Sequence, residues 1–274
     1  MVYNRPSSIS VSTDAYLKSY GAIEEAKNNF YNLGAGTWEH PCWTNIDLPP
    51  QTPEFAAIQA PSIHHDFVKN DTLPIESNQV EAFYCSHVVE HIPDFANNNL
   101  FNDVHRCLKK GGIFRISTGP CADMDWEAVQ RKDKNWWYFF DDPKFLDTLV
   151  SKSKPLTVYD KWLFHIATPR SIHCKTPCEE KYDSREIEFL IHQNKNNKED
   201  LFDNLTSGLT FNINFPGDHL SWWNYDKLKV QLVQAGFKDV YRSGYGQSQS
   251  CWMRDLKYFD QTYPQISVYV EARK

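Results

Sequence analysis

Apolar residues recur along positions 30–120 in two patterns that predict strands and helices in alternation. Five short apolar runs have the length of strands: 30–33, 44–48, 62–67, 80–86 and 113–117. Before the last run, the segment up to Leu108 places Leu100, Val104 and Leu108 at i, i+4 and i+8, which predicts a helix with one buried face. Lys109-Lys110 and Gly111-Gly112 predict its end. Strands that alternate with helices predict a parallel sheet with helices on both faces.

The same alternation returns near the C-terminus. Residues 225–235 form an amphipathic pattern that predicts a helix with Leu228, Leu232 and Val233 turned inward and Gly236 as its cap. Two further runs, 237–241 and 266–272, predict strands, and the second alternates apolar with polar residues. The pattern therefore predicts one α/β fold that is built from two separate stretches of chain.

Residues 121–217 interrupt this alternation. Their first half is rich in aromatic residues, at Trp126 and through 136–140, and their second half is charged and rich in asparagine. We predict that 121–217 is a cap that binds a substrate, inserted into a core made of 1–120 and 218–274. The aromatic stretch is interpreted as the core of this cap, with an aromatic pocket as the alternative. The first 20 residues are predicted to be a lid or an extra helix.

Composition and charge exclude several classes of function. The chain of 274 residues has a net charge of −6, and nucleic-acid binding instead requires clustered Lys and Arg. No run of about 18 apolar residues is present and the N-terminus is polar, so neither a membrane span nor a secretion leader is expected. Seven scattered cysteines indicate free thiols in a reducing compartment, and we predict a cytoplasmic protein. Cys174 and Cys178, near His165 and His173, have an unusual spacing for zinc, and no metal is predicted.

The most informative segment for function joins Gly34-x-Gly36 to Asp47. Glycines after a strand let the backbone turn sharply and approach a ligand, and a carboxylate at the end of the next strand can accept hydrogen bonds from a ribose diol. Position 39, where a dinucleotide fingerprint has its third glycine, is Glu39. An acid there repels a pyrophosphate, so the pattern favours a nucleoside without phosphates over NAD or FAD.

Several segments resemble motifs of one family in the family's order. They are Asn32-Leu33-Gly34-Ala35-Gly36, Trp43-Thr44-Asn45-Ile46-Asp47, His65-Asp66-Phe67, Ser86-His87-Val88-Val89-Glu90-His91, His105 to Gly112, Ala235-Gly236-Phe237 and Ser267 to Ala272. In these segments the chain resembles the class I S-adenosylmethionine-dependent methyltransferases, of the type 11 group. It departs from them at Asn32, where the family usually has an acid.

The resemblance implies a Rossmann-like, seven-stranded, mostly parallel sheet and S-adenosyl-L-methionine as cofactor. Carried over residue by residue, the expected cofactor-binding positions are Asn32, Gly34, Ala35, Gly36, Asp47, Leu48, Asp66, Phe67 and Ser86. Asp47 is expected to hold the ribose. Asp66, or the backbone beside it, is expected to accept a hydrogen bond from the adenine amino group.

Three histidines are candidates for a catalytic base. His87, Glu90 and His91 share one face if a helix begins at His87, and His219 directly precedes the resumed α/β pattern. His87, Glu90 and His91 have three interpretations. They brace the turn after the strand, they supply a base, or they bind a metal ion, as the similar Glu-x-x-Glu-His stretch of ubiquinone-pathway O-methyltransferases does. His87 in place of the first Glu weakens the case for magnesium.

These observations together predict methyl transfer to a small molecule or a sugar, with oxygen favoured over nitrogen as the acceptor atom. A hydroxyl acceptor needs a base, and the histidines supply candidates. The alternative is a methyltransferase-like domain without catalytic activity, which binds a nucleoside or serves as a partner subunit. The sequence carries no signal for an oligomeric state.

Overall fold

The computed structural model describes residues 12–69, 71–141, 149–150 and 156–274. Two compact units make up the chain. The sheet unit consists of residues up to Val89, Asp94–Thr118 and Tyr225–Lys274. The inserted unit consists of Glu90–Pro93 and Gly119–Asn224.

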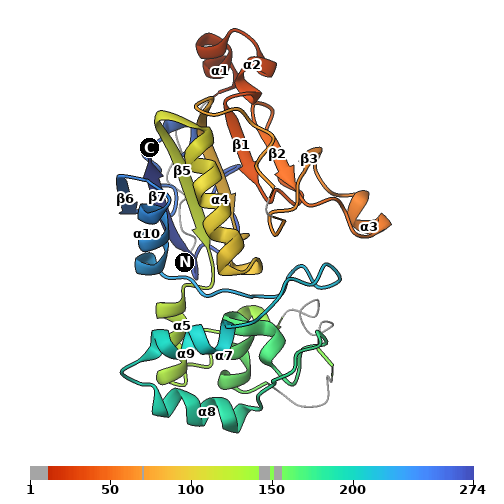
Figure 1. Ribbon diagram of the computed structural model, residues 1–274, viewed down its shortest axis with the longest axis vertical. Helices are drawn as coiled ribbons and strands as arrows, with labels where there is room; N and C mark the ends of the chain where they lie inside the picture. Colours follow the sequence, from red (N-terminus) through yellow and green to blue (C-terminus); the bar gives the residue numbers. More distant parts are fainter. Residues whose placement is uncertain (1–11, 70, 142–148, 151–155) are drawn as a thin grey trace. The chain divides into compact units, whose positions relative to one another are not determined.

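A seven-stranded sheet forms the centre of the sheet unit (Figure 1). Its strands are β1 (Phe30–Leu33), β2 (Thr44–Asp47), β3 (Ser62–His64), β4 (Val80–Ser86), β5 (Leu108–Thr118), β6 (Asp239–Arg242) and β7 (Val268–Arg273). They lie in the order β3-β2-β1-β4-β5-β7-β6. The first five strands are parallel, and β7 is antiparallel to both β5 and β6. The predicted seven-stranded, mostly parallel α/β fold is confirmed.

This order places the candidate residues at one edge. The carboxyl ends of parallel strands meet at the same edge of a sheet, where open α/β folds bind their ligands. Gly34 follows β1, Asp47 ends β2, and Ser86 ends β4. From β1 the chain adds β2 and β3 on one side and then β4 and β5 on the other, so the strand order reverses at β1.

In the part of the sheet unit that the structure describes, five helices and two 3₁₀ turns accompany the sheet. They are α1 (Thr13–Tyr20), α2 (Ile23–Lys27), α3 (Pro53–Ala56), α4 (Asp94–Cys107), α10 (Tyr225–Gln234), η1 (Val89–His91), which crosses into the inserted unit, and η4 (Cys251–Met253). Leu100 and Val104 of α4 are buried, as the predicted stripe requires. On α10, Leu228 and Leu232 are buried, but Val233 is 50% exposed, so its predicted inward position is wrong. Figure 1 shows α10 beside β6 and β7.

The predicted boundary between α4 and the fifth strand is also wrong. The helix ends at Cys107, and Leu108 already pairs with Val80 of β4. The Lys109 to Gly112 segment belongs to β5, where Gly111 has φ +83° and donates its N–H to the carbonyl of Lys274 at 2.9 Å. Leu108 and Ile113 on either side of the segment pair with β4, and this pairing outweighs the local helix-end signal of the lysines and glycines.

The N-terminal part that the structure describes begins with α1. Tyr16 of this helix is fully buried, and its hydroxyl accepts a hydrogen bond from the indole of Trp43 at 3.0 Å. Its ring packs on Phe30 of β1 at 5.3 Å. This packing attaches the helix to the sheet. The predicted role of the first 20 residues as a lid stays a prediction, and residues 1–11 lie outside the described residues.

A fully buried ion cluster stabilises the C-terminal half of the sheet unit. Arg115 of β5 donates to Asp260 at 2.6 Å and to Glu271 of β7 at 2.8 Å. All three side chains are 0% exposed. Burial alone lowers the pKa of Arg115, but the two carboxylates outweigh it and raise that pKa above its usual value. The guanidinium therefore keeps its charge at every physiological pH.

The inserted unit is helical in the part of it that the structure describes. Its helices and 3₁₀ turns are α5 (Ala122–Gln130), η2 (Tyr138–Asp141), α7 (Val158–Ala167), η3 (Thr168–Arg170), α8 (Ser184–Gln193) and α9 (Lys198–Thr206). Trp126 packs against Trp162 and Phe202 at ring distances of 6.0 and 5.6 Å. The aromatic rings thus pack on one another as a core. Ala122 N–H donates to Trp223 O at 2.8 Å, so the insertion begins and ends at neighbouring points.

No helix in the described ranges has the length and apolar character that crossing a membrane requires.

Candidate functional site

The glycine turn after β1 needs glycine twice, for two different reasons. Gly34 has φ +66°, and a Cβ there would lie 2.3 Å from Cγ2 of Val88. Gly36 has φ +55°, but a Cβ there would meet nothing within 4 Å. Gly34 is therefore required by packing, whereas the open side of Gly36 leaves room for a ligand to approach the backbone.

Asp47 is attached to this turn. Its Oδ2 accepts a hydrogen bond from Gly36 N–H at 2.7 Å, and its Oδ1 accepts one from Leu48 N–H at 2.7 Å. The structure thus brings Gly36, Asp47 and Leu48 together, although Gly36 and Asp47 are 11 residues apart. Asp47 remains partly exposed at the end of β2.

Asn32 lies inside β1, where its register partners are Asn45 on β2 and Tyr84 on β4. Its side chain is 2% exposed, and its Oδ1 has no hydrogen-bond partner among the described residues. A buried amide oxygen without a protein partner is an acceptor for a ligand or a water molecule. Ala35, between the two glycines, is 7% exposed.

Asp66 and Phe67 follow β3 rather than belonging to it, because the strand ends at His64 and not at residue 67 as predicted. Asp66 has local partners. Its Oδ1 accepts from Val68 N–H at 3.0 Å, and Oδ2 lies 3.7 Å from Nζ of Lys69. Both predicted residues are partly buried.

Ser86 and His87 lie at the carboxyl end of β4. Ser86 Oγ accepts a hydrogen bond from Ser117 Oγ at 2.8 Å. His87 has φ +54°, which is unusual for a residue with a side chain, and its Nε2 lies 2.8 Å from Ser267 Oγ. Ser267 donates its own proton to Tyr263 O at 2.8 Å. Ser267 therefore accepts from Nε2–H of His87, and the lone pair of that imidazole is on Nδ1.

His91 and His219 lie in the inserted unit, beside Glu90. The two imidazole centroids are 4.9 Å apart. Glu90, His91 and His219 each place one ligand atom within 4.8 Å of the other two. Burial lowers the pKa of His219 to about 3, and the neighbouring His91 adds to this shift. His219 is thus neutral at physiological pH.

The expectation that His87 shares a helical face with Glu90 and His91 is wrong. The positive φ of His87 is incompatible with a right-handed helix, and the 3₁₀ turn η1 begins only at Val89. The structure pairs His87 with Ser267 and pairs His91 with His219 instead.

The sequence analysis missed a buried pair in the inserted unit. Nδ1 of His165 lies 2.5 Å from Oδ2 of Asp125, and the other oxygen of Asp125 accepts from the Trp136 indole at 2.6 Å. The two partners of the pair are 40 residues apart, on α7 and α5, so no local motif could reveal it.

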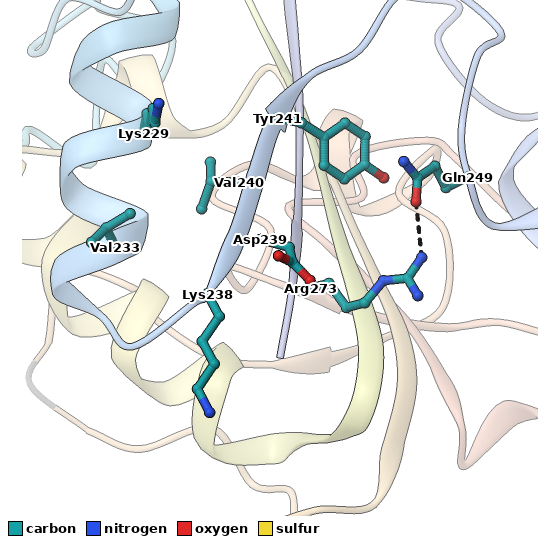
Figure 2. A pocket seen from close by; sticks show the side chains of 8 residues that line it. All are labelled: Lys229, Val233, Lys238, Asp239, Val240, Tyr241, Gln249 and Arg273. Atoms are coloured by element: carbon teal, nitrogen blue, oxygen red, sulfur yellow. Dashed lines mark hydrogen bonds between the residues drawn. The ribbon is translucent and has the colours of Figure 1, made fainter.

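A cavity of about 610 Å³ opens beside the edge strand β6 (Figure 2). Its wall comprises Lys229, Val233, Lys238, Asp239, Val240, Tyr241, Gln249 and Arg273. Arg273 donates to Gln249 Oε1 at 2.9 Å across it. None of the predicted site residues lines this cavity. Its strand β6 is at the edge of the sheet, four positions away from β1.

Comparison with known proteins identifies one part of the chain. Residues 40–116 match the family model described as a methyltransferase domain. This match includes Asp47, Asp66 and Ser86 and begins after the glycine turn. No curated protein matches the chain significantly.

Three solved structures are among those that the chain matches. A methyltransferase that depends on S-adenosylmethionine, from Archaeoglobus fulgidus, has 11% identity, with coverage of 95% of this chain and 92% of its own and a TM-score of 0.41. One from Mesorhizobium loti has 14% identity, coverage of 93% and 99%, and a TM-score of 0.38. Human N-acetylserotonin methyltransferase has 13% identity, coverage of 95% and 54%, and a TM-score of 0.39. Similarity at this level carries no argument about the fold or the acceptor.

Proposed function

We propose that the chain, which is an S-adenosylmethionine-dependent methyltransferase by its matched domain and its sheet, methylates a hydroxyl group of a small molecule or a sugar. S-adenosyl-L-methionine supplies an electrophilic methyl group on its sulfonium. The observation that carries the proposal is the shared edge of the sheet unit, where the glycine turn, Asp47 and His87 follow β1, β2 and β4.

The residues at this edge fit a nucleoside cofactor. Gly36 leaves its Cβ side open, Asn32 has a buried acceptor without a protein partner, and Asp47 is a partly exposed carboxylate fixed by two backbone N–H groups. We assign Asp47 to the ribose hydroxyls, since a carboxylate accepts two hydrogen bonds side by side. The proposed cofactor-binding set is Asn32, Gly34, Ala35, Gly36, Asp47, Leu48, Asp66, Phe67 and Ser86.

His87 is the proposed catalytic base. A hydroxyl must lose its proton as it attacks a methyl group, and a positioned imidazole takes that proton. Ser267 fixes the ring through Nε2, so Nδ1 is the atom that accepts the proton. The positive φ of His87 supports this role, because backbone strain persists where the surrounding structure enforces it and is frequent at active sites.

The other two candidate histidines are less suited to proton transfer. An imidazole with a pKa near 3, as in His219, is a weak base at neutral pH. His91 packs against His219 in the same pair. We propose that the inserted unit, which contains the predicted cap 121–217, supplies groups that select the acceptor.

A labelled-methyl assay over a panel of sugars, phenols, other small-molecule alcohols and amines tests this function. We expect transfer to a hydroxyl acceptor in wild-type protein. His87→Ala is expected to lower turnover by roughly 10²–10⁴-fold while the Kd for S-adenosylhomocysteine stays unchanged. His192→Ala, which removes an exposed histidine of α8, is the control and is expected to keep full turnover.

The contrary result is equally clear. Transfer to amines alone, with normal turnover in His87→Ala, would show that alignment without a base is sufficient and would overturn the hydroxyl acceptor.

A further inference from the structure

We infer that Glu90, His91 and His219 form a binding site for a divalent transition-metal ion, best suited to Zn²⁺. The three residues each place one ligand atom within 4.8 Å of the others. In a tetrahedral zinc site with bonds of about 2.0–2.1 Å, ligand atoms are about 3.4 Å apart. A side-chain movement of about an ångström therefore closes the cluster around an ion.

The hydrogen bonds of both imidazoles support this assignment independently. Nδ1 of His91 lies 3.2 Å from the carbonyl of Asp218, and Nδ1 of His219 lies 2.7 Å from the carbonyl of His165. A carbonyl oxygen can only accept, so each Nδ1 carries the proton and each Nε2 carries the lone pair. Metal-binding histidines characteristically donate their second ring N–H to a carbonyl or carboxylate, which fixes the tautomer and the ring orientation.

The backbone holds the two parts of the site together. Glu90 and His91 are consecutive in η1, and the carbonyl of Glu90 accepts from Leu220 N–H at 2.8 Å and from Ser221 N–H at 3.2 Å. Ser221 Oγ in turn donates to Ile92 O at 3.0 Å. These bonds fix η1 against the segment that carries His219, so the ligands are arranged before an ion binds.

The donor set selects the type of ion. Two imidazole nitrogens and one carboxylate oxygen suit zinc and its neighbours, whereas magnesium and calcium prefer oxygen ligands throughout. Glu90 is 2% exposed, so its carboxylate is shielded from solvent beside the two imidazoles. Three protein ligands leave a fourth tetrahedral position for water or a ligand oxygen.

Zinc titration of protein freed of its tag and treated with EDTA tests the site. We expect one equivalent of Zn²⁺ to bind with micromolar or tighter affinity, and Co²⁺ to give the intense visible absorption of a four-coordinate ion. Glu90→Gln, His91→Ala and His219→Ala are each expected to weaken binding at least about 100-fold and to remove the Co²⁺ absorption. His192→Ala is the matched control, because His192 and Glu188 form an exposed pair of the same residue types.

A second measurement does not depend on the folding of variants. X-ray absorption at the zinc edge of the wild-type complex is expected to show two imidazoles and one or two oxygens at about 2.0–2.1 Å. Absence of stoichiometric uptake, full binding by a folded His91→Ala/His219→Ala double variant, or a zinc shell without imidazoles would each overturn the site. These readouts are independent of methyl transfer, so failure of the proposed function leaves them interpretable.

Discussion

The two units bury polar groups of different kinds. In the sheet unit, one guanidinium, Arg115, lies between the carboxylates of Asp260 and Glu271 without solvent contact. In the inserted unit, buried or partly buried imidazoles pair with carboxylates, as in His165 with Asp125 and His173 with Asp160 at 3.2 Å. The first arrangement joins carboxylates to a guanidinium, which stays charged, whereas the second joins carboxylates to imidazoles.

A buried guanidinium and a buried imidazole have different chemical properties. The raised pKa of Arg115 makes its ion cluster a fixed connection between β5, β7 and the segment that carries Asp260. Imidazoles serve as proton acceptors and metal ligands because the neutral ring has a nitrogen with a lone pair. The sheet unit therefore uses this buried charge for stability, apart from the cofactor-binding set and the base His87 that we propose at its edge, and the inserted unit buries imidazoles suited to binding a metal ion.

Arg115→Met tests the stabilising half of this comparison and has the largest expected effect. Removing the guanidinium leaves Asp260 and Glu271 buried without their cation, which costs about 3–5 kcal/mol of unfolding free energy. Urea unfolding measures it. Arg131→Met is the control, because Arg131 pairs with Glu127 on the surface of the inserted unit with 74% and 66% of the side chains exposed. A similar loss in both variants would contradict the distinction between the units.

Gly34→Ala and Gly36→Ala sharpen the comparison within the sheet unit. Both residues have positive φ, which costs an alanine about 1 kcal/mol. Only Gly34 would also meet Val88, and such overpacking adds about 1–3 kcal/mol. Thermal unfolding is expected to show a clearly larger loss for Gly34→Ala. Equal losses would show that Val88 moves away without cost.

The pH dependence of stability tests a buried imidazole that belongs to the sheet unit. Burial lowers the pKa of His40 to about 4, while an unfolded histidine has a pKa of about 6.5. The unfolded state therefore binds the proton first as pH falls, so stability is complete above pH 6.5 and declines between pH 6.5 and 4. The expected loss between pH 7.5 and pH 5 is about 2 kcal/mol.

His40→Gln isolates this contribution. Wild type and variant are unfolded by urea at both pH values, and the variant is expected to lose less stability than wild type on acidification. An identical pH dependence would mean that His40 takes up its proton in the folded state without cost.

Thr157→Ala has the smallest expected effect and concerns the inserted unit. Thr157 accepts from Asp160 N–H at 3.2 Å, and Asp160 Oδ2 accepts from Thr157 N–H at 2.7 Å, which closes a capping box at the start of α7. Loss of the hydroxyl is expected to lower the free energy of unfolding, measured by urea unfolding, by about 1 kcal/mol. Thr157→Ser keeps the hydroxyl and is expected to restore most of this stability. A failure of serine to do so would assign the effect to packing.

Much of the sheet unit follows from its sequence because short-range rules decide it. Apolar runs of strand length define the parallel strands, and the stripe at Leu100 and Val104 defines the helix between two of them. Gly34 and Gly36 define the turn after β1. The errors lie where tertiary contacts override local signals. Lys109 to Gly112 predict a helix end, but they lie within β5 between Leu108 and Ile113, which both pair with β4, and Gly111 and Gly112 bond to Lys274.

The candidate site was only partly predictable. Gly36 and Asp47 were named together from their order in the sequence, and the structure joins them by a hydrogen bond. The pairing of His91 with His219 depends on contacts across 128 positions of chain, which no local spacing encodes. The prediction that His87 and His91 share a helical face is wrong, because the positive φ of His87 keeps it out of the helical turn.

Binding of S-adenosylhomocysteine to wild type and Asp47→Ala, measured by calorimetry, tests the central claim that the glycine turn and Asp47 hold the methyl donor. The loss of charge-assisted hydrogen bonds to a ribose is expected to weaken binding by about 2 kcal/mol, which is roughly 30-fold. Asp133→Ala is the control, because Asp133 Oδ1 also accepts from a backbone N–H, that of Asn135 at 2.9 Å, but in the inserted unit. Unchanged affinity in folded Asp47→Ala would contradict the account.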